Sequence, residues 1–110
     1  MNKEYYKLKT ALIKSLANPT RLMIVDCLRR GEKTVSEIVS VLQDEQSNVS
    51  KNLAILKNQG IIKDKKIGLN VYYSLKCTCI NEFFSCLDAM ISENLEYQQE
   101  LVNNSKKIGE

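Results

Sequence analysis

Residues 45–75 read Glu45-Gln-Ser-Asn-Val-Ser-Lys-Asn-Leu-Ala-Ile-Leu-Lys-Asn-Gln-Gly60, then Ile61-Ile-Lys-Asp-Lys-Lys-Ile-Gly-Leu-Asn-Val-Tyr-Tyr-Ser-Leu75. Val49, Leu53 and Leu56 recur at helical spacing before Gly60, which predicts an amphipathic helix over about 46–58 with a polar first turn. Two strand-like runs then flank Gly68, which predicts a hairpin. A short helix followed by a basic hairpin is the layout of a DNA-reading helix and its wing.

The charge of the chain is distributed unevenly. The whole chain of 110 residues carries a net charge of +3, and its size fits one domain. The segment 47–76 holds six lysines and one acid, whereas 81–110 holds six acids and two lysines. A basic middle segment suits contact with phosphate, and an acidic C-terminal segment does not.

Several classes of protein do not fit the composition. The N-terminal residues are polar and charged, and no apolar run approaches the roughly 20 residues that span a bilayer. We therefore expect a cytoplasmic protein whose four cysteines are thiols. The chain has no histidine, no glycine-rich phosphate loop and no nucleophile with a partner base, so we expect no enzyme.

Local signals predict four more helices. The first spans about 4–17. Asn18-Pro19 reads as an N-cap with proline in the first helical turn, opening a second helix that stops before Gly31. Thr34 and Glu37 have capping-box spacing and open a third helix. The helix-turn-helix is thus predicted at about 34–58 and the wing at about 61–75.

The last predicted helix, at about 79–103, carries a sustained apolar stripe. A domain this small cannot bury the whole stripe, so a partner helix from a second copy of the chain is expected. The stripe consists of Ile80, Phe83, Phe84, Leu87, Met90, Ile91, Leu95, Leu101 and Val102.

Several segments in the same order resemble the ArsR/SmtB family of winged-helix repressors. They are Leu16–Val25, Gly31–Ile38, Gln46–Leu53, Leu56–Ile62 and Val71–Leu75, and the similarity covers about residues 8–100. The resemblance implies a homodimer, formed through the first and last helices, that binds a palindromic operator until an inducer releases it. The expected fold is mainly α with a small β-hairpin: a single winged helix-turn-helix domain over 1–110.

The predicted DNA-binding residues lie on the fourth helix and the wing. Glutamine and asparagine can read adenine, serine can bond a base edge or a phosphate, and lysine suits phosphates. The family often has a basic residue and a histidine in the segment that here reads Ser50-Lys51-Asn52. Asn52 departs from that pattern, so its role is open. The predicted set is Gln46, Ser47, Asn48, Ser50, Lys51, Lys57, Lys63, Lys65, Lys66 and Asn70.

The cysteines are the candidates for inducer sensing. Many family members have a Cys-x-Cys metal site at the start of the third helix, which here reads Lys33-Thr-Val-Ser-Glu-Ile38. Others bind zinc through histidines and carboxylates of the last helix, and this chain has no histidine. The remaining candidate ligands are Cys77, Cys79 and Cys86. Thiolates favour soft ions, so As(III), Sb(III), Cd(II) or Cu(I) are the possible inducers, with no obligatory cofactor.

The geometry of this site and a second sensing chemistry stay open. Cys79 and Cys86 on one helix would lie about 10 Å apart, so a shared ion needs either a folded-over segment or the partner's cysteine. Other family members sense an oxidant or a persulfide with paired cysteines on the second and last helices, and the resemblance implies Cys27 and Cys86 as the alternative redox pair here. Buried cysteines usually serve as small apolar side chains, which is the competing interpretation for Cys27. A winged-helix module that binds only other proteins is the remaining alternative.

Overall fold

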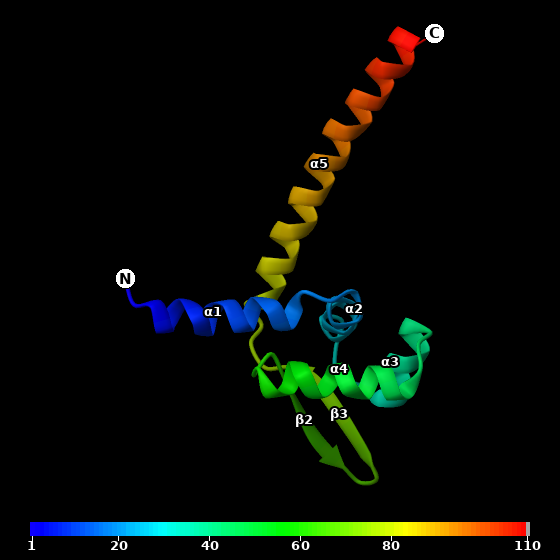
Figure 1. Ribbon diagram of the computed structural model, residues 1–110. Helices are drawn as coiled ribbons and strands as arrows, with labels where there is room; N and C mark the ends of the chain where they lie inside the picture. The colour runs from blue at the N-terminus through cyan, green and yellow to red at the C-terminus, as the bar shows by residue number, and fades with distance from the viewer. Residues whose placement is uncertain (110) are drawn as a thin grey trace. The chain divides into compact units, whose positions relative to one another are not determined.

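The computed structural model describes residues 1–109, with side chains as far as Asn104. The chain divides into two compact units, Met1–Cys77 and Thr78–Glu110. The first unit holds four helices and a small sheet, and the second holds one long helix (Figure 1). The elements are α1 (Lys3–Leu16), α2 (Pro19–Leu28), β1 (Lys33–Thr34), α3 (Val35–Leu42), α4 (Gln46–Asn58), β2 (Ile62–Ile67), β3 (Asn70–Leu75) and α5 (Ile80–Gly109).

The predicted helix caps are present. The Asn18 side chain accepts a hydrogen bond from the backbone N–H of Arg21 at 3.2 Å, and Pro19 begins α2. The Thr34 hydroxyl accepts from the Glu37 N–H at 3.3 Å, and the Glu37 carboxylate accepts from the Thr34 N–H at 3.1 Å. Both bonds of the capping box are therefore made, which fixes the entry to α3.

The core of the first unit lies where α2, α3, α4 and β2 meet. Helix α4 packs against α2, α3 and β2, and in Figure 1 it lies between α2 and the hairpin. Three apolar residues of α4, Val49, Leu53 and Leu56, face this core at helical spacing, as the apolar pattern predicts. Among the described residues, the largest fully buried side chains are Ile24, Val25, Ile38, Val49, Leu53, Leu56 and Ile62.

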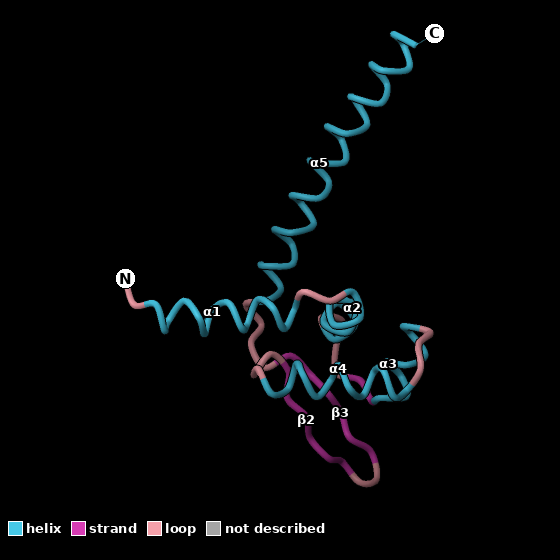
Figure 2. Tube along the Cα trace, in the orientation of Figure 1, coloured by secondary structure: helices cyan, strands magenta, loops and turns pink. Residues whose placement is uncertain are grey.

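The wing belongs to a three-stranded antiparallel sheet, in the order β1-β3-β2. Figure 2 shows the hairpin of β2 and β3 in magenta. Strands β2 and β3 pair from Ile62↔Leu75 to Ile67↔Asn70, with Gly68 at a φ of +62° in the turn. The prediction of a hairpin is confirmed, and the sheet has a third strand that was not predicted. The missed strand, β1, has only two residues, too few to show an alternating pattern in the sequence.

The second unit consists largely of α5. The helix begins one residue later than predicted and continues past the predicted end at 103. Several large apolar side chains along it are exposed, among them Met90, Ile91 and Leu95 at 60%, 56% and 58%. Among the described residues, no helix is both long and apolar enough to cross a membrane.

Candidate nucleic-acid interface

Helices α3 and α4 form a helix-turn-helix. Helix α3 ends where Gln43 adopts a left-handed conformation, with a φ of 53°, and donates its N–H to the Val39 carbonyl at 2.8 Å. Two residues, Asp44 and Glu45, then lead into α4. This short turn sets the two helices at an angle at which the first turns of α4 can project from the protein.

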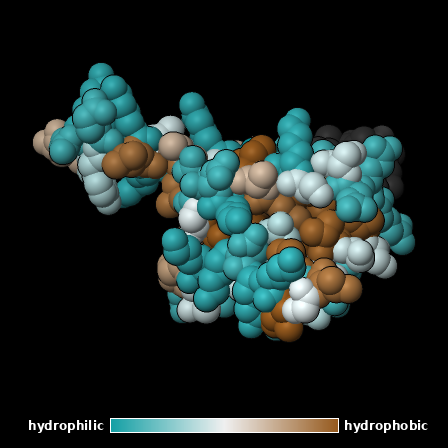
Figure 3. Space-filling view, turned by 90° about the horizontal axis from the view of Figure 1, so that it is seen from below, coloured by the Kyte–Doolittle hydropathy of each residue, from teal (hydrophilic) through white to brown (hydrophobic). Residues whose placement is uncertain are grey.

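The first turns of α4 present polar side chains to solvent. Gln46, Ser47, Ser50 and Lys51 are exposed, whereas Asn48 is half-buried. Viewed from the side of α4 and the wing, the surface is mostly hydrophilic, with apolar patches between the polar residues (Figure 3). The exposed amide and hydroxyl groups can donate to and accept from base edges, and the ammonium group can contact a phosphate.

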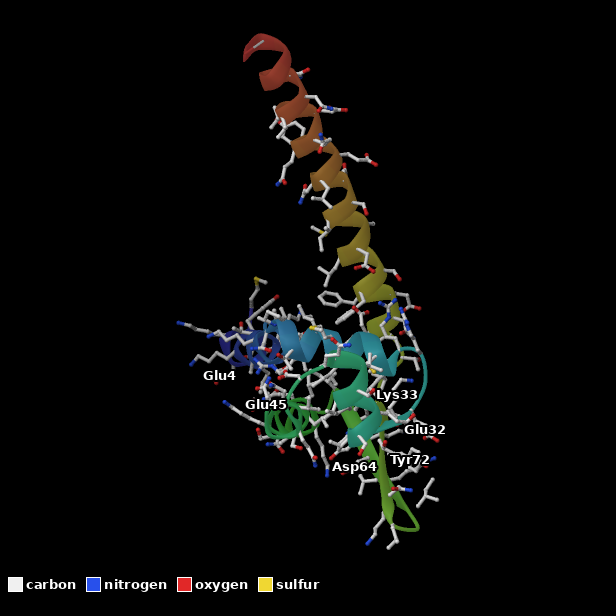
Figure 4. The ribbon with its side chains drawn as sticks, turned by 90° about the vertical axis from the view of Figure 1, so that its right-hand side faces the viewer. Glu4, Glu32, Lys33, Glu45, Asp64 and Tyr72 are labelled. Carbon is white, nitrogen blue, oxygen red and sulfur yellow. The ribbon has the colours of Figure 1, made fainter. Side chains whose placement is uncertain are left out.

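Two of the predicted phosphate-binding lysines are held in ion pairs. Lys57 Nζ lies 2.9 Å from Asp64 Oδ2 and so joins the last turn of α4 to β2. The hydrogen bond to Asp64 raises the pKa of Lys57. Lys65 Nζ lies 3.3 Å from Glu32 Oε2, and Figure 4 labels both acids. A phosphate has to compete with a carboxylate for each of these two lysines.

The other predicted basic residues have no such competitor. No ion pair involving Lys51, Lys63 or Lys66 is found within the described part of the chain, and all three side chains are exposed. Asn70 is also exposed, at the start of β3 beside the turn of the wing. The exposed ammonium groups on α4 and on the wing therefore suit this face of the first unit to a polyanion.

Asn52 is a site residue that the sequence left without a role. Its side chain is 4% exposed, on the core face of α4. Its Oδ1 accepts from Arg21 Nη1 at 3.0 Å, and its Nδ2 donates to the Asn48 carbonyl at 2.9 Å and to Asn48 Oδ1 at 3.2 Å. The sequence does contain a signal for this role. Asn52 falls at helical spacing with Val49 and Leu56, on the face predicted to be buried, where a polar side chain requires a hydrogen-bond partner.

The cysteines differ from the expectation of four thiols. Cys77 and Cys79 are disulfide-bonded, whereas Cys27 and Cys86 are free. The expectation rested on the compartment alone, and it overlooked that cysteines so close in sequence can satisfy the short Cα separation of a disulfide. In the oxidised form, Cys77 and Cys79 offer no thiolate to a metal ion. Nor do any three His, Cys, Asp or Glu side chains form a metal-binding group within the described residues.

Cys27 and Cys86 have different environments. Cys27 is 5% exposed in α2, and burial raises the pKa of its thiol despite the nearby charges of Lys33 and Arg30. Cys86 is exposed on α5. Cys27 is therefore a poor nucleophile at neutral pH, and Cys86 is the more accessible of the two.

The sequence profile described as "Bacterial regulatory protein, arsR family" matches residues 18–64, from the second helix into β2. The Bacillus subtilis transcriptional repressor SdpR is 32% identical over 71 residues, which cover 64% of this chain and 79% of SdpR. The chain belongs to the ArsR family. The sequence-based resemblance is confirmed, and the family's relatives are named as regulators of transcription, in agreement with the prediction that the chain is no enzyme.

A second relative is more similar over a shorter segment. The SmtB-homologous transcriptional repressor of Synechocystis is 39% identical over 61 residues, 56% of this chain. That match spans 46% of the Synechocystis protein, so this chain covers about half the length of that relative.

Solved structures of this family share the fold. Rv0081 of Mycobacterium tuberculosis has a TM-score of 0.80 at 28% identity, covering 88% of this chain and 98% of that one. A Mycobacterium bovis domain, Mb0332, described as a homodimeric winged helix-turn-helix DNA-binding domain, has a TM-score of 0.76 at 28% identity. The match covers 86% of this chain and 87% of the Mb0332 chain. The predicted winged helix-turn-helix fold is confirmed.

Proposed function

We propose that this ArsR-family protein is a transcriptional repressor that binds operator DNA as a homodimer. The observation that carries the proposal is the exposed polar first turn of α4, flanked by a wing on which Lys63 and Lys66 are exposed. In this arrangement α4 lies in the major groove, and the wing lies along the phosphate backbone or the minor groove. The repressor names of SdpR and the Synechocystis relative support this assignment.

Two helices supply apolar surface for the dimer. On α1, Tyr5, Leu8 and Leu12 share one face and are 52%, 73% and 42% exposed. On α5, the exposed apolar residues follow the stripe predicted from the sequence. Apolar faces of this kind on two helices are typical of a surface between copies of a chain. The homodimeric state named for Mb0332 supports the same assembly here.

The proposed inducer acts on thiols, and a soft metal or metalloid is its first candidate. As(III), Sb(III), Cd(II) or Cu(I) would bind Cys77 and Cys79 after their reduction, with Cys86 of the same chain or of the partner as the third ligand. Cys86 lies roughly 120° around α5 from the centre of the apolar stripe. This position favours a ligand role at the edge of the stripe over one inside it.

A redox switch is the second candidate, and the disulfide-bonded state of Cys77 and Cys79 favours it. Two thiols would lose two electrons and two protons to a peroxide or a polysulfide, and one S–S bond would form. A dithiol reductant would reverse the reaction. Pairing of Cys27 with Cys86 is the less favoured version, because Cys27 is buried and its pKa is raised.

The test is release of DNA by candidate inducers. Reduced protein would be bound to its own upstream promoter and titrated with As(III), Cd(II) or a persulfide donor, beside the variants Cys79→Ser and Cys86→Ser. Release by As(III) or Cd(II) that is lost in either variant supports a sulfur-ligated metal sensor. Release only by the persulfide, reversed by dithiothreitol, supports the redox switch. Failure of the reduced protein to bind DNA in competition with random duplex would refute the repressor function, and a winged-helix protein-interaction module would replace it.

The remaining properties follow from operator binding. A repressor of this kind acts where the chromosome is, so the expected location is the cytoplasm. An obligatory cofactor is not part of the proposal, because the metal or oxidant acts as the signal.

A further inference from the structure

A chain of hydrogen bonds connects the end of α1 to the turn before α4. Arg21 donates through Nε to the Ser15 carbonyl and through Nη1 to Asn52 Oδ1. Asn52 donates to Asn48, as described above, and Asn48 Nδ2 donates to Asp44 Oδ2 at 2.6 Å. Four side chains from α2, α4 and the helix-turn-helix turn thereby form one connected series.

The direction of the series is fixed by its two charged ends. The guanidinium group of Arg21 can only donate, and the carboxylate of Asp44 can only accept. Asn52 must therefore turn its oxygen toward Arg21 and its nitrogen toward Asn48, and Asn48 must turn its nitrogen toward Asp44. Only one orientation of each amide satisfies all of these bonds, so the two asparagines are held more firmly than isolated surface amides.

Helix α4 has particular need of this support. Its N-cap residue, Glu45, makes no side-chain capping bond, unlike the N-cap residues of α1, α2 and α3. A first turn without a cap leaves its N–H groups to solvent and frays more easily. The Asn48–Asp44 bond instead joins the first turn of α4 to the preceding turn of the chain.

Asn48 is correspondingly ill placed to read a base. It is half-buried, its nitrogen is bonded to a carboxylate, and its oxygen accepts from Asn52. Bidentate reading of adenine uses both atoms of the amide. Turning the amide outward would break both internal bonds, whereas Gln46 and Ser50 are exposed and make no competing side-chain bond within the described residues.

We propose that Asn48 and Asn52 are positioning residues that, with Arg21 and Asp44, hold the first turn of α4 in place for DNA. Base reading then falls to Gln46, Ser47 and Ser50. This inference rests on the proposed function and changes the role predicted for Asn48 from a reader to a support. It also gives Asn52 a role that the sequence alone did not.

The first test compares DNA specificity. The duplex that the wild-type chain selects from a random pool would be varied one base pair at a time, and affinities measured for Asn48→Ala, Asn52→Leu and the double variant. We expect Asn48→Ala to weaken binding by a similar factor on every duplex and to keep their rank order. The double variant should be little weaker than Asn52→Leu alone, because both changes break one series.

The matched control is Gln46→Ala, on the same turn of the helix. A variant that has lost a base-reading side chain should lose its preference at one base pair, by about 5- to 150-fold, and keep its preferences at the other base pairs. If Asn48→Ala behaves in this way, Asn48 reads a base and the inference is overturned. Multiplicative effects of the two asparagine changes would also overturn it.

The second test needs no DNA and so separates the inference from the proposed function. Backbone amide exchange over residues 49–53 would be measured in the free wild-type protein, in Asn48→Ala and in the control Ser50→Ala. Alanine is the better helix former, so replacing an unsupported asparagine would slow exchange. The inference predicts exchange about fivefold faster in Asn48→Ala and no acceleration in the control. Unchanged or slower exchange in Asn48→Ala would refute the supporting role, even if no duplex is selected.

Discussion

The ion pairs of the proposed DNA face predict how strongly binding should depend on salt. Each lysine that neutralises a phosphate contributes about 0.9 to the slope of log affinity against log salt concentration. Of the five lysines on this face, Lys57 and Lys65 are paired with acids, while Lys51, Lys63 and Lys66 are exposed and have no ion pair within the described residues. Three available lysines on each of two copies give a slope of about −5 for the dimer.

Single substitutions should divide the lysines into two groups. Lys51→Gln removes an available charge from both copies and should reduce the slope by about 2. Lys57→Gln removes a lysine that already has a carboxylate partner. It should reduce the slope by less than about half of the reduction expected for Lys51→Gln. The assay is fluorescence anisotropy of a labelled duplex at several concentrations of potassium chloride.

The converse experiment removes the acidic partner of a paired lysine, so that the lysine becomes available to a phosphate. Glu32→Gln frees Lys65 and should steepen the slope, whereas Glu93→Gln on α5 makes the same change in net charge without freeing a lysine of the DNA face. Equal slopes for the Lys51 and Lys57 variants would refute the reasoning. So would equal effects of the two glutamate changes, because net charge alone would then explain the binding.

Three further predictions concern stability and the thiols. Leu53→Ala empties a core position that is 1% exposed and should lower the free energy of unfolding by about 2–5 kcal/mol, measured by urea denaturation. Hydrogen bonds from Thr34 lower the pKa of Glu37 below its ordinary value of 4.5, so its contribution is present above pH 4.5 and lost as the pH falls through the lowered pKa. Glu37→Gln should therefore show a smaller loss of stability than wild type on acidification below pH 4.5. In the native protein, iodoacetamide should modify Cys86 rapidly and Cys27 only after unfolding, as mass spectrometry of peptides would report.

The prediction for Leu53 has a matched control, and each of the three has an outcome that would contradict it. Leu69→Ala changes a side chain that is 97% exposed and should alter stability by no more than about 0.5 kcal/mol. A comparable loss in both leucine variants would contradict the assignment of the core. If the wild type and Glu37→Gln lose stability equally as the pH falls, the capping box does not depend on the charge of Glu37. Rapid native labelling of Cys27 would contradict its burial.

Local signals in the sequence were enough to predict most of the first unit. Asn18-Pro19, the Thr34–Glu37 capping box and the stop at Gly60 each act within a few residues, so they predict helix ends without knowledge of the tertiary structure. The spacing of Val49, Leu53 and Leu56 likewise predicts which face of α4 is buried.

Apart from the disulfide-bonded state of Cys77 and Cys79, the features that the sequence did not predict depend on contacts between distant residues. Strand β1 exists because it pairs with β3, about 40 residues later in the chain. The bond of Asn52 to Arg21 joins residues 31 positions apart. Likewise, the ion pairs of Lys57 and Lys65 distinguish lysines that look equivalent in the sequence. Which residues the DNA contacts, and which cysteines sense the inducer, remain predictions for the same reason.

The most direct test of the proposed repressor is selection of DNA from a pool of random duplexes by the full chain, with the stoichiometry of the selected complex measured by light scattering. The account predicts enrichment of an inverted repeat, bound by two copies of the chain with their α4 helices about one helical turn of DNA apart. A pool that emerges without enrichment, or a complex with one copy of the chain on a sequence without symmetry, would contradict it.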